Sequence, residues 1–413
     1  MTTSYTDLTE LSLKRAGALS ETFREIGPVA DKENRFSYES IAAFKESGLI
    51  PLVVPTECGG DGGDLWLCSQ VMTELSRGDS AIALAYNMHM GLIGMMLGLL
   101  DEEQKKHWFG KIVNENKIVF GPISEKRAGF SGLADVKAIP QPEGGYRLYG
   151  QKNWGTLCEA ADIIVTVATI TDADGNMPED YEDWVDAEYS FVHDFVIDRE
   201  SGLGDGIRIE RVWDAMGMHA TGTQTIVFDG FYIPESGKAS PWRAGAFQTL
   251  EWFVILFASI YRGLGLRCFE ESKELLKKKT LGATFGAIAA SEVKVSQIGH
   301  IIDGVGDMAV KCEVNRRLIQ QTCTDISTGW DDEHWTPEER FPFICIAKTE
   351  VAKNVLHMTK EAMSMVGGQS FRSGTVFERM YRDAAASMFQ PLNAAQNAAY
   401  LGEYYLVGDQ LVD

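Results

Sequence analysis

The spacing of apolar residues changes twice along the chain, near residues 119 and 240, and these changes constrain the fold more than any other sequence feature. Before the first change, segments such as SYESIAAFKESGLI carry apolar residues at helical spacing. Between the changes, short runs such as DIIVTVATI and TQTIVFDGFYIP are rich in β-branched and aromatic residues and are separated by Gly, Asp and Pro. After the second change, the helical spacing returns in long segments.

These patterns predict a multidomain α+β protein of three parts. We predict an all-α N-terminal domain over residues 1–118 and a middle β-domain, a small barrel or sandwich, over residues 119–235. Residues 236–413 are expected to form a C-terminal four-helix bundle. The chain has 413 residues, which is enough for domains of this size.

Charge and cysteine usage exclude several classes of protein. The net charge of −21 argues against binding to nucleic acid, because an acidic surface repels phosphates. The seven cysteines form no CxxC pair, so we expect no metal site and a reducing, cytoplasmic location. No stretch of roughly 18 uninterrupted apolar residues occurs, and we therefore expect no membrane span.

Five motifs, in this order, resemble those of the acyl-CoA dehydrogenase flavoprotein family. They are GLIPLVVPTECGGDGGD, FGPISEKRAG, GGYRLYGQKNWGTLCEAADIIV, MGMHATGTQTIVFDGFYIP and VGGQSFRSGTVFERMYRD. The resemblance covers nearly the whole chain. It implies an FAD-dependent oxidoreductase that acts on an acyl thioester of CoA or of an acyl carrier protein. It also implies a homo-oligomer, a tetramer or dimer, with an electron-transfer flavoprotein or oxygen as the electron acceptor.

The same resemblance implies residues that contact the flavin ring. Trp154 matches the family residue that packs on the flavin, and Thr156 matches one that hydrogen-bonds to the ring. Ile123 and Ser124 match residues that face the pyrimidine side. An isoalloxazine ring needs a flat apolar wall and neutral donors, which these residue types supply. The alternative is that Trp154 is a core residue of the β-domain and Ser124 a strand-end hydroxyl.

Other positions correspond to contacts with the rest of the cofactor and with the substrate. Gly367 and Gly368 match glycines that approach the adenosine diphosphate part from the neighbouring chain, although a plain helix cap would also explain them. Lys278 stands where an Arg reaches the pyrophosphate; it keeps the charge and lacks the bidentate fork. A run of Lys is also typical of a solvated helix end. Phe130 lies where the family has Gly-Ser-Asp beside the thioester, so we expect it to contact the substrate.

The usual catalytic carboxylate is missing. In the family reaction, an α,β-dehydrogenation, a Glu nine residues after the Arg of an Arg-Asp pair removes the α-proton. Counting from Arg382 leads to Pro391, which follows Gln390, and neither can act as a carboxylate base. The chain is therefore expected to be a divergent member of the family.

Three alternatives follow from the missing carboxylate. Glu251, at the start of the first long C-terminal helix, is the candidate catalytic base of a dehydrogenase. It stands two residues from the aligned position of the known alternative base, roughly 200° around a helix, and an acid in the first turn is also favoured by the helix dipole. The second alternative is a flavin-dependent oxygenase or oxidase, which needs no such base. The third is a flavin-binding relative without activity.

Overall fold

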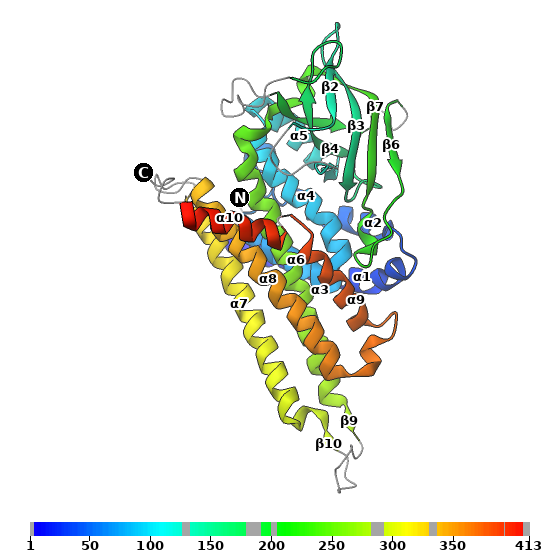
Figure 1. Cartoon of the computed structure of the whole chain (residues 1–413), viewed down its shortest axis with the longest axis vertical. Helices are drawn as coiled ribbons and strands as arrows, with labels where there is room; N and C mark the ends of the chain where they lie inside the picture. The colour runs from blue at the N-terminus through cyan, green and yellow to red at the C-terminus, as the bar shows by residue number, and fades with distance from the viewer. Residues whose placement is uncertain are drawn as a thin grey trace.

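The computed structural model describes residues 4–125, 133–178, 191–199, 205–281, 293–329, 337–391 and 393–407. Helices come first in the chain, a β-sheet follows, and a second helical region ends it (Figure 1). This order confirms the predicted α+β fold. Phe130, the predicted substrate contact, lies outside the described residues.

The N-terminal region is helical. Its helices are α1 (Tyr5–Lys32), α2 (Glu39–Glu46), α3 (Leu65–Gly78), α4 (Ser80–Leu99) and α5 (Glu102–Asn114). Aspartate side chains begin three of them, because a carboxylate at the N-cap accepts hydrogen bonds from free backbone N–H groups. At α5, Asp101 and Gln104 form a reciprocal capping box. Helix α4 is apolar on nearly every side and is almost entirely buried.

The described residues of the middle region form an eight-stranded sheet. The strands are β1 (Val119–Phe120), β2 (Lys137–Pro140), β3 (Tyr146–Gly155), β4 (Ile163–Ile170), β5 (Val192–Asp198), β6 (Ile207–Glu210), β7 (Gln224–Ile233) and β8 (Lys238–Pro241). Their order is β6-β7-β3-β2-β4-β5-β8, with β1 paired to β4. The β1–β4 and β2–β4 pairs are parallel and the remaining pairs are antiparallel. Because β8 pairs with β5, the sheet extends beyond residue 235.

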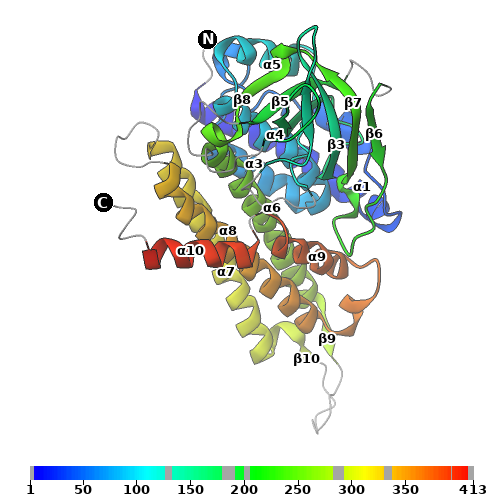
Figure 2. The same ribbon diagram turned by 45° about the horizontal axis from the view of Figure 1, so that its top comes forward.

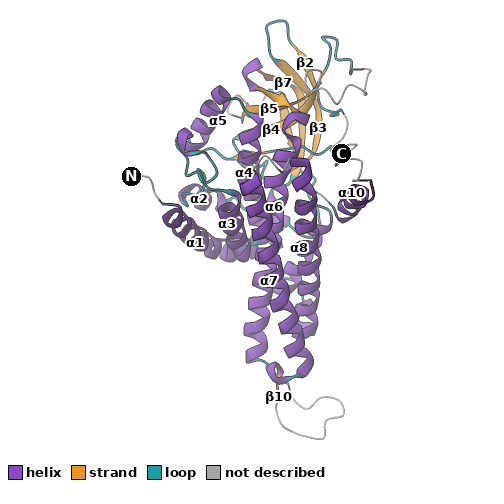
Figure 3. Ribbon diagram, turned by 90° about the vertical axis from the view of Figure 1, so that its left-hand side faces the viewer, coloured by secondary structure: helices purple, strands orange, loops and turns teal. Residues whose placement is uncertain are grey.

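The C-terminal region is built on three long helices that lie side by side (Figure 3). It comprises α6 (Trp242–Lys278), the short strands β9 (Thr280–Leu281) and β10 (Val293–Lys294), α7 (Gly299–Gly329), α8 (Pro337–Val366), α9 (Val376–Ala385) and α10 (Ala394–Val407). Helix α10 lies across α7 and α8 (Figure 2). Helix α6 is central, since it packs on α3, α4, α7 and α8.

Helices α4 and α6 contain the two most apolar long segments of the described chain. Ser80–Leu99 and Leu250–Lys278 are long and apolar enough to cross a membrane by length and composition. In the folded chain, however, 89% and 78% of their apolar windows are buried. Their composition is therefore accounted for by the protein core. Both helices reach the sheet, α4 at β1 and α6 at β5 and β8, and the functional site lies at this junction.

Candidate functional site

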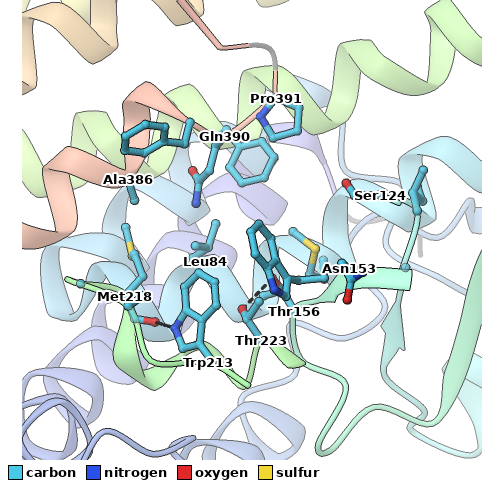
Figure 4. A pocket seen from close by; sticks show the side chains of 18 of the residues that line it. Leu84, Ser124, Asn153, Thr156, Trp213, Met218, Thr223, Ala386, Gln390 and Pro391 are labelled. Atoms are coloured by element: carbon cyan, nitrogen blue, oxygen red, sulfur yellow. Dashed lines mark hydrogen bonds between the residues drawn. The ribbon is translucent and has the colours of Figure 1, made fainter. Parts of the chain in front are cut away.

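A cavity of about 620 Å³ lies where the sheet meets helices α4, α6 and α9 (Figure 4). The sheet side contributes Ile123, Ser124, Asn153, Trp154, Thr156 and Thr223, and the loop over residues 212–218 contributes its edge. The helical side contributes Leu84, Met88, Met95, Leu250, Phe253 and Phe257. The C-terminal segment closes the cavity with Arg382, Ala385, Ala386, Phe389, Gln390 and Pro391.

The four residues predicted to contact the flavin ring all line this cavity. Trp154 is 54% exposed, and its ring makes an edge contact with Trp213, with centroids 5.7 Å apart. Neutral hydroxyls lie nearby, since Thr156 Oγ1 is 2.9 Å from Thr223 Oγ1. An accessible aromatic face beside neutral hydroxyls fits an isoalloxazine ring.

A buried ion pair, Lys152–Glu125, supports the sheet side of the cavity. Lys152 Nζ donates to a carboxylate oxygen of Glu125 and to the carbonyl oxygen of Ile123, the latter at 3.3 Å. The Glu125 carboxylate also accepts hydrogen bonds from the backbone N–H groups of Asp135 and Val136. Both charged side chains are almost fully buried, at 1% and 2% exposure. The pair therefore ties strand β3 to the segment that carries Ile123 and Ser124.

A second acid shares this interior. Asp194 on β5 is fully buried, and neither carboxylate oxygen has a hydrogen-bond partner within the described residues. Burial raises the pKa of Asp194 well above its usual value, while the nearby Lys152 charge opposes that shift. Burial correspondingly lowers the pKa of Lys152. The interior of the sheet thus holds one ion pair and one acid whose charged form is disfavoured by burial.

The Arg-Asp pair at residues 382–383 holds the loop at the cavity edge. Arg382 donates to the carbonyl oxygen of Met216 at 3.1 Å and to the Asp31 carboxylate at 2.7 and 3.1 Å. Asp383 accepts from the backbone N–H of Met218 at 2.7 Å. Burial and the neighbouring Asp79 raise the pKa of Asp383 to about 6. The motif therefore joins α9 to the loop over residues 212–218.

His219 completes this cluster as a cation. Its Nδ1 lies 2.9 Å from the carbonyl oxygen of Asp31, and its Nε2 lies 2.8 Å from that of Ala215. Both ring nitrogens therefore face acceptors, which requires a doubly protonated imidazole. The hydrogen bond to the Asp31 carboxylate raises the pKa of His219 to about 9.

This arrangement predicts a specific loss of stability at high pH. The pKa of His219 is higher in the folded than in the unfolded chain, so its stabilisation is complete below about pH 6.5 and is lost as pH rises through about 9. A shift of this size corresponds to at most about 3 kcal/mol. We expect His219→Gln to lower Tm clearly at pH 6 and much less at pH 10. The exposed His107→Gln variant is the control, and an equal deficit at both pH values would contradict the prediction.

The structure does not bring Glu251 into the cavity. Leu250 and Phe253 line the cavity, whereas Glu251 is fully buried against α8, where Arg340 Nε donates to its Oε1 at 3.1 Å. Helix phase explains this difference, because successive residues point about 100° apart. Among the described residues that line the cavity, the carboxylates are Glu125, held by Lys152, and the exposed Asp214.

The residues predicted to contact the pyrophosphate lie away from the cavity, at the end of the bundle farthest from the sheet (Figure 1). Gly367 has a φ of +82°, which favours glycine, and a Cβ at Gly368 would meet open space. Lys278 is exposed, while its neighbour Lys279 donates to the carbonyl oxygen of Val366 at 2.6 Å. The lysine run that includes Lys278 and Lys279 is thus adjacent to the turn at Gly367 and Gly368, and Lys279 rather than Lys278 makes the hydrogen bond beside this turn.

Sequence reasoning missed Trp213 and the role of the loop around it. Its indole Nε1 donates to the carbonyl oxygen of Met218 at 3.0 Å, which fixes the ring at the cavity edge. The signal was present in the run RVWDAMGMHATG, which leads into a motif already recognised. The sequence analysis considered Gln390 only as a residue that cannot act as the catalytic base. The structure places its amide in the cavity (Figure 4).

Comparisons with known proteins agree with the fold. The sequence model "Acyl-CoA dehydrogenase, N-terminal domain" matches residues 18–116, and "Acyl-CoA dehydrogenase, C-terminal domain" matches residues 262–389. The short-chain specific acyl-CoA dehydrogenase of Bos taurus mitochondria is 24% identical over 372 residues, covering 87% of this chain and 81% of that protein. The glutaryl-CoA dehydrogenase of Desulfococcus multivorans is 24% identical over 377 residues, covering 87% of each protein.

Solved structures share the fold at low identity. Butyryl-CoA dehydrogenase from Megasphaera elsdenii has a TM-score of 0.81 and 21% identity, covering 98% of this chain and all of that one. FMN-bound TdsC from Paenibacillus sp. A11-2, a dibenzothiophene monooxygenase, has a TM-score of 0.83 and 20% identity, covering 96% and 97%. Fold and site together define a flavoprotein oxidoreductase. The chain belongs to the acyl-CoA dehydrogenase family.

Proposed function

We propose that this family member is a flavin-dependent oxygenase acting on an apolar substrate. One observation carries the proposal: within the described lining, no carboxylate is placed to remove an α-proton. A general base must reach its proton within hydrogen-bond distance and be shielded from water. Glu125 is held by Lys152, Asp214 is exposed, and Glu251 faces Arg340.

The cavity suits the alternative chemistry. When bound, a reduced flavin supplies two electrons, so that one atom of O₂ enters the substrate and the other leaves as water. The chain's own part is to hold the substrate against a largely apolar surface. Leu250, Phe253 and Phe257 on α6 form that wall opposite Trp154 and Ser124. The structural likeness to a named monooxygenase supports the proposal at the level of the fold.

Dehydrogenation of an acyl thioester is the second candidate function. It is favoured by the curated relatives, which are named as acyl-CoA dehydrogenases. In this case the thioester would be carried by CoA or by an acyl carrier protein, and an electron-transfer flavoprotein or oxygen would accept the electrons. Its base would have to be Glu251 after a rearrangement, or a group beyond the described residues.

Anaerobic spectroscopy separates the two candidates. We expect short- and medium-chain acyl-CoA thioesters to leave the oxidised flavin absorbance of the holoenzyme unchanged without oxygen. We expect the photochemically reduced holoenzyme to consume O₂ rapidly on mixing with air-saturated buffer. Bleaching of the flavin by any of the thioesters would instead establish the dehydrogenase.

We further propose FAD as the flavin, bound in a homo-oligomer. The open glycine turn at Gly367 and Gly368, with Lys279 beside it, supports a dinucleotide whose adenosine end is contacted by a second copy. Ile302, Val310 and Val314 on α7 are 45–62% exposed, which supports burial against another subunit. Chromatography of the flavin released by denaturation distinguishes FAD from FMN.

A further inference from the structure

The amide of Gln390 is held in one orientation. Tyr261 on α6 is buried, and its hydroxyl contacts Gln390 Oε1. No other group within the described residues receives the Tyr261 proton, so the hydroxyl must donate it to that oxygen. Burial also raises the pKa of Tyr261 well above its usual value and keeps the hydroxyl protonated. The amide nitrogen is consequently the group left for other partners.

Hydrogen bonds from Lys348 fix the backbone of the turn that carries Gln390. Lys348 on α8 is 1% exposed, and its Nζ donates to the carbonyl oxygens of Ser387 and Gln390, each at 2.9 Å. The backbone N–H of Gln390 donates to the carbonyl oxygen of Ala386 at 3.2 Å. Backbone and side chain of Gln390 are therefore both fixed before any ligand binds.

Gln390 is an isolated polar group on this side of the cavity. Leu250, Phe253, Phe257 and Phe389 line the cavity as apolar surface. Arg382 also lines it, but its guanidinium is engaged by Asp31, Glu378 and a backbone carbonyl. Figure 4 shows the Gln390 amide directed into the cavity, and Nε2 donates to no acceptor within the described residues.

We infer that Gln390 determines substrate specificity by donating a hydrogen bond from Nε2 to an oxygen acceptor of an uncharged, apolar substrate. Tyr261 is the positioning residue, because it occupies Oε1 and so prevents the amide from rotating. The inference rests on the proposed function only in taking the cavity as the substrate pocket. A ligand without the acceptor leaves a donor unsatisfied in apolar surroundings, which lowers its relative affinity.

A pair of probes that differ by one oxygen tests the inference. Acetophenone carries a carbonyl acceptor, whereas ethylbenzene has nearly the same shape and none. Their dissociation constants are measured by calorimetry on the oxidised holoenzyme, where no turnover takes place. We expect acetophenone to bind about tenfold more tightly, as one hydrogen bond in an apolar site predicts. Equal affinities, or binding of neither probe, would overturn the inference.

Variants test whether the preference for acetophenone over ethylbenzene depends on the Gln390 amide. Gln390→Leu should abolish the preference while ethylbenzene still binds, and Tyr261→Phe should reduce it. The nearly isosteric Gln390→Glu should reverse it, because two acceptors then face each other, and this variant serves if the leucine variant fails to fold. Gln321→Leu on the surface of α7 is the matched control. A preference unchanged in both Gln390 variants would refute the inference, whatever the outcome of the oxygen test.

Discussion

Replacing Glu251 with alanine is expected to destabilise the folded protein by about 3–5 kcal/mol, the usual cost of removing one partner from a buried ion pair. Glu251 is fully buried, and the Arg340 side chain that donates to it is 4% exposed. The alanine variant leaves the guanidinium without this carboxylate between α6 and α8. We expect a marked fall in the midpoint of thermal or denaturant unfolding.

Two further variants separate this structural role from catalysis. Replacing both partners with Met should restore most of the stability, since an apolar pair of similar volume is often neutral or stabilising. Glu251→Gln tests the predicted base. If Glu251 removes the α-proton, anaerobic flavin reduction by an acyl thioester should slow by about 10²–10⁴-fold with flavin binding intact. Glu251 has a structural role alone if the alanine variant is unstable and either no thioester reduces the parent's flavin or the glutamine variant is reduced at the parental rate.

Lys152→Met is expected to have a comparable effect on stability and to release the flavin as well. It removes the cation that pairs with Glu125 and acts electrostatically on Asp194, so that two buried acids remain inside the sheet. The expected loss is again about 3–5 kcal/mol. Flavin retention should fall because Lys152 holds the segment of Ile123 and Ser124. Thermal unfolding and the ratio of flavin absorbance to protein absorbance measure the two effects.

A compensating change provides the control. In the double variant Lys152→Met with Glu125→Gln, no buried charge of this pair remains, and the amide oxygen can still accept from one of the two backbone N–H groups, of Asp135 or of Val136, that donate to Glu125. We expect stability to recover in large part. If the single variant is as stable as the parent and retains its flavin, the ion pair does not support the wall.

Local sequence was sufficient to predict the type and order of the elements. Helical and strand spacing are properties of consecutive residues, so the changes near 119 and 240 appear before any packing is known. The prediction that Trp154 and Thr156 belong to the site came from the resemblance of the run GQKNWGTL to the acyl-CoA dehydrogenase family, and both residues line the cavity. The helix starts at Asp64 and Asp101 are local in the same sense.

Only the tertiary structure decided what each polar group near the cavity faces. Glu251 points to Arg340 because α8 packs on that face of α6. The spacing of apolar residues within each helix does not specify how the two helices are rotated relative to each other. Tyr261 and Gln390 are 129 residues apart in sequence, and Lys152 approaches Asp194 across separate strands. The sequence by itself therefore determined the three-part fold and the absence of a glutamate at Pro391. Packing between distant segments decided that a fixed amide occupies the cavity there, because side-chain partners depend on how whole elements dock.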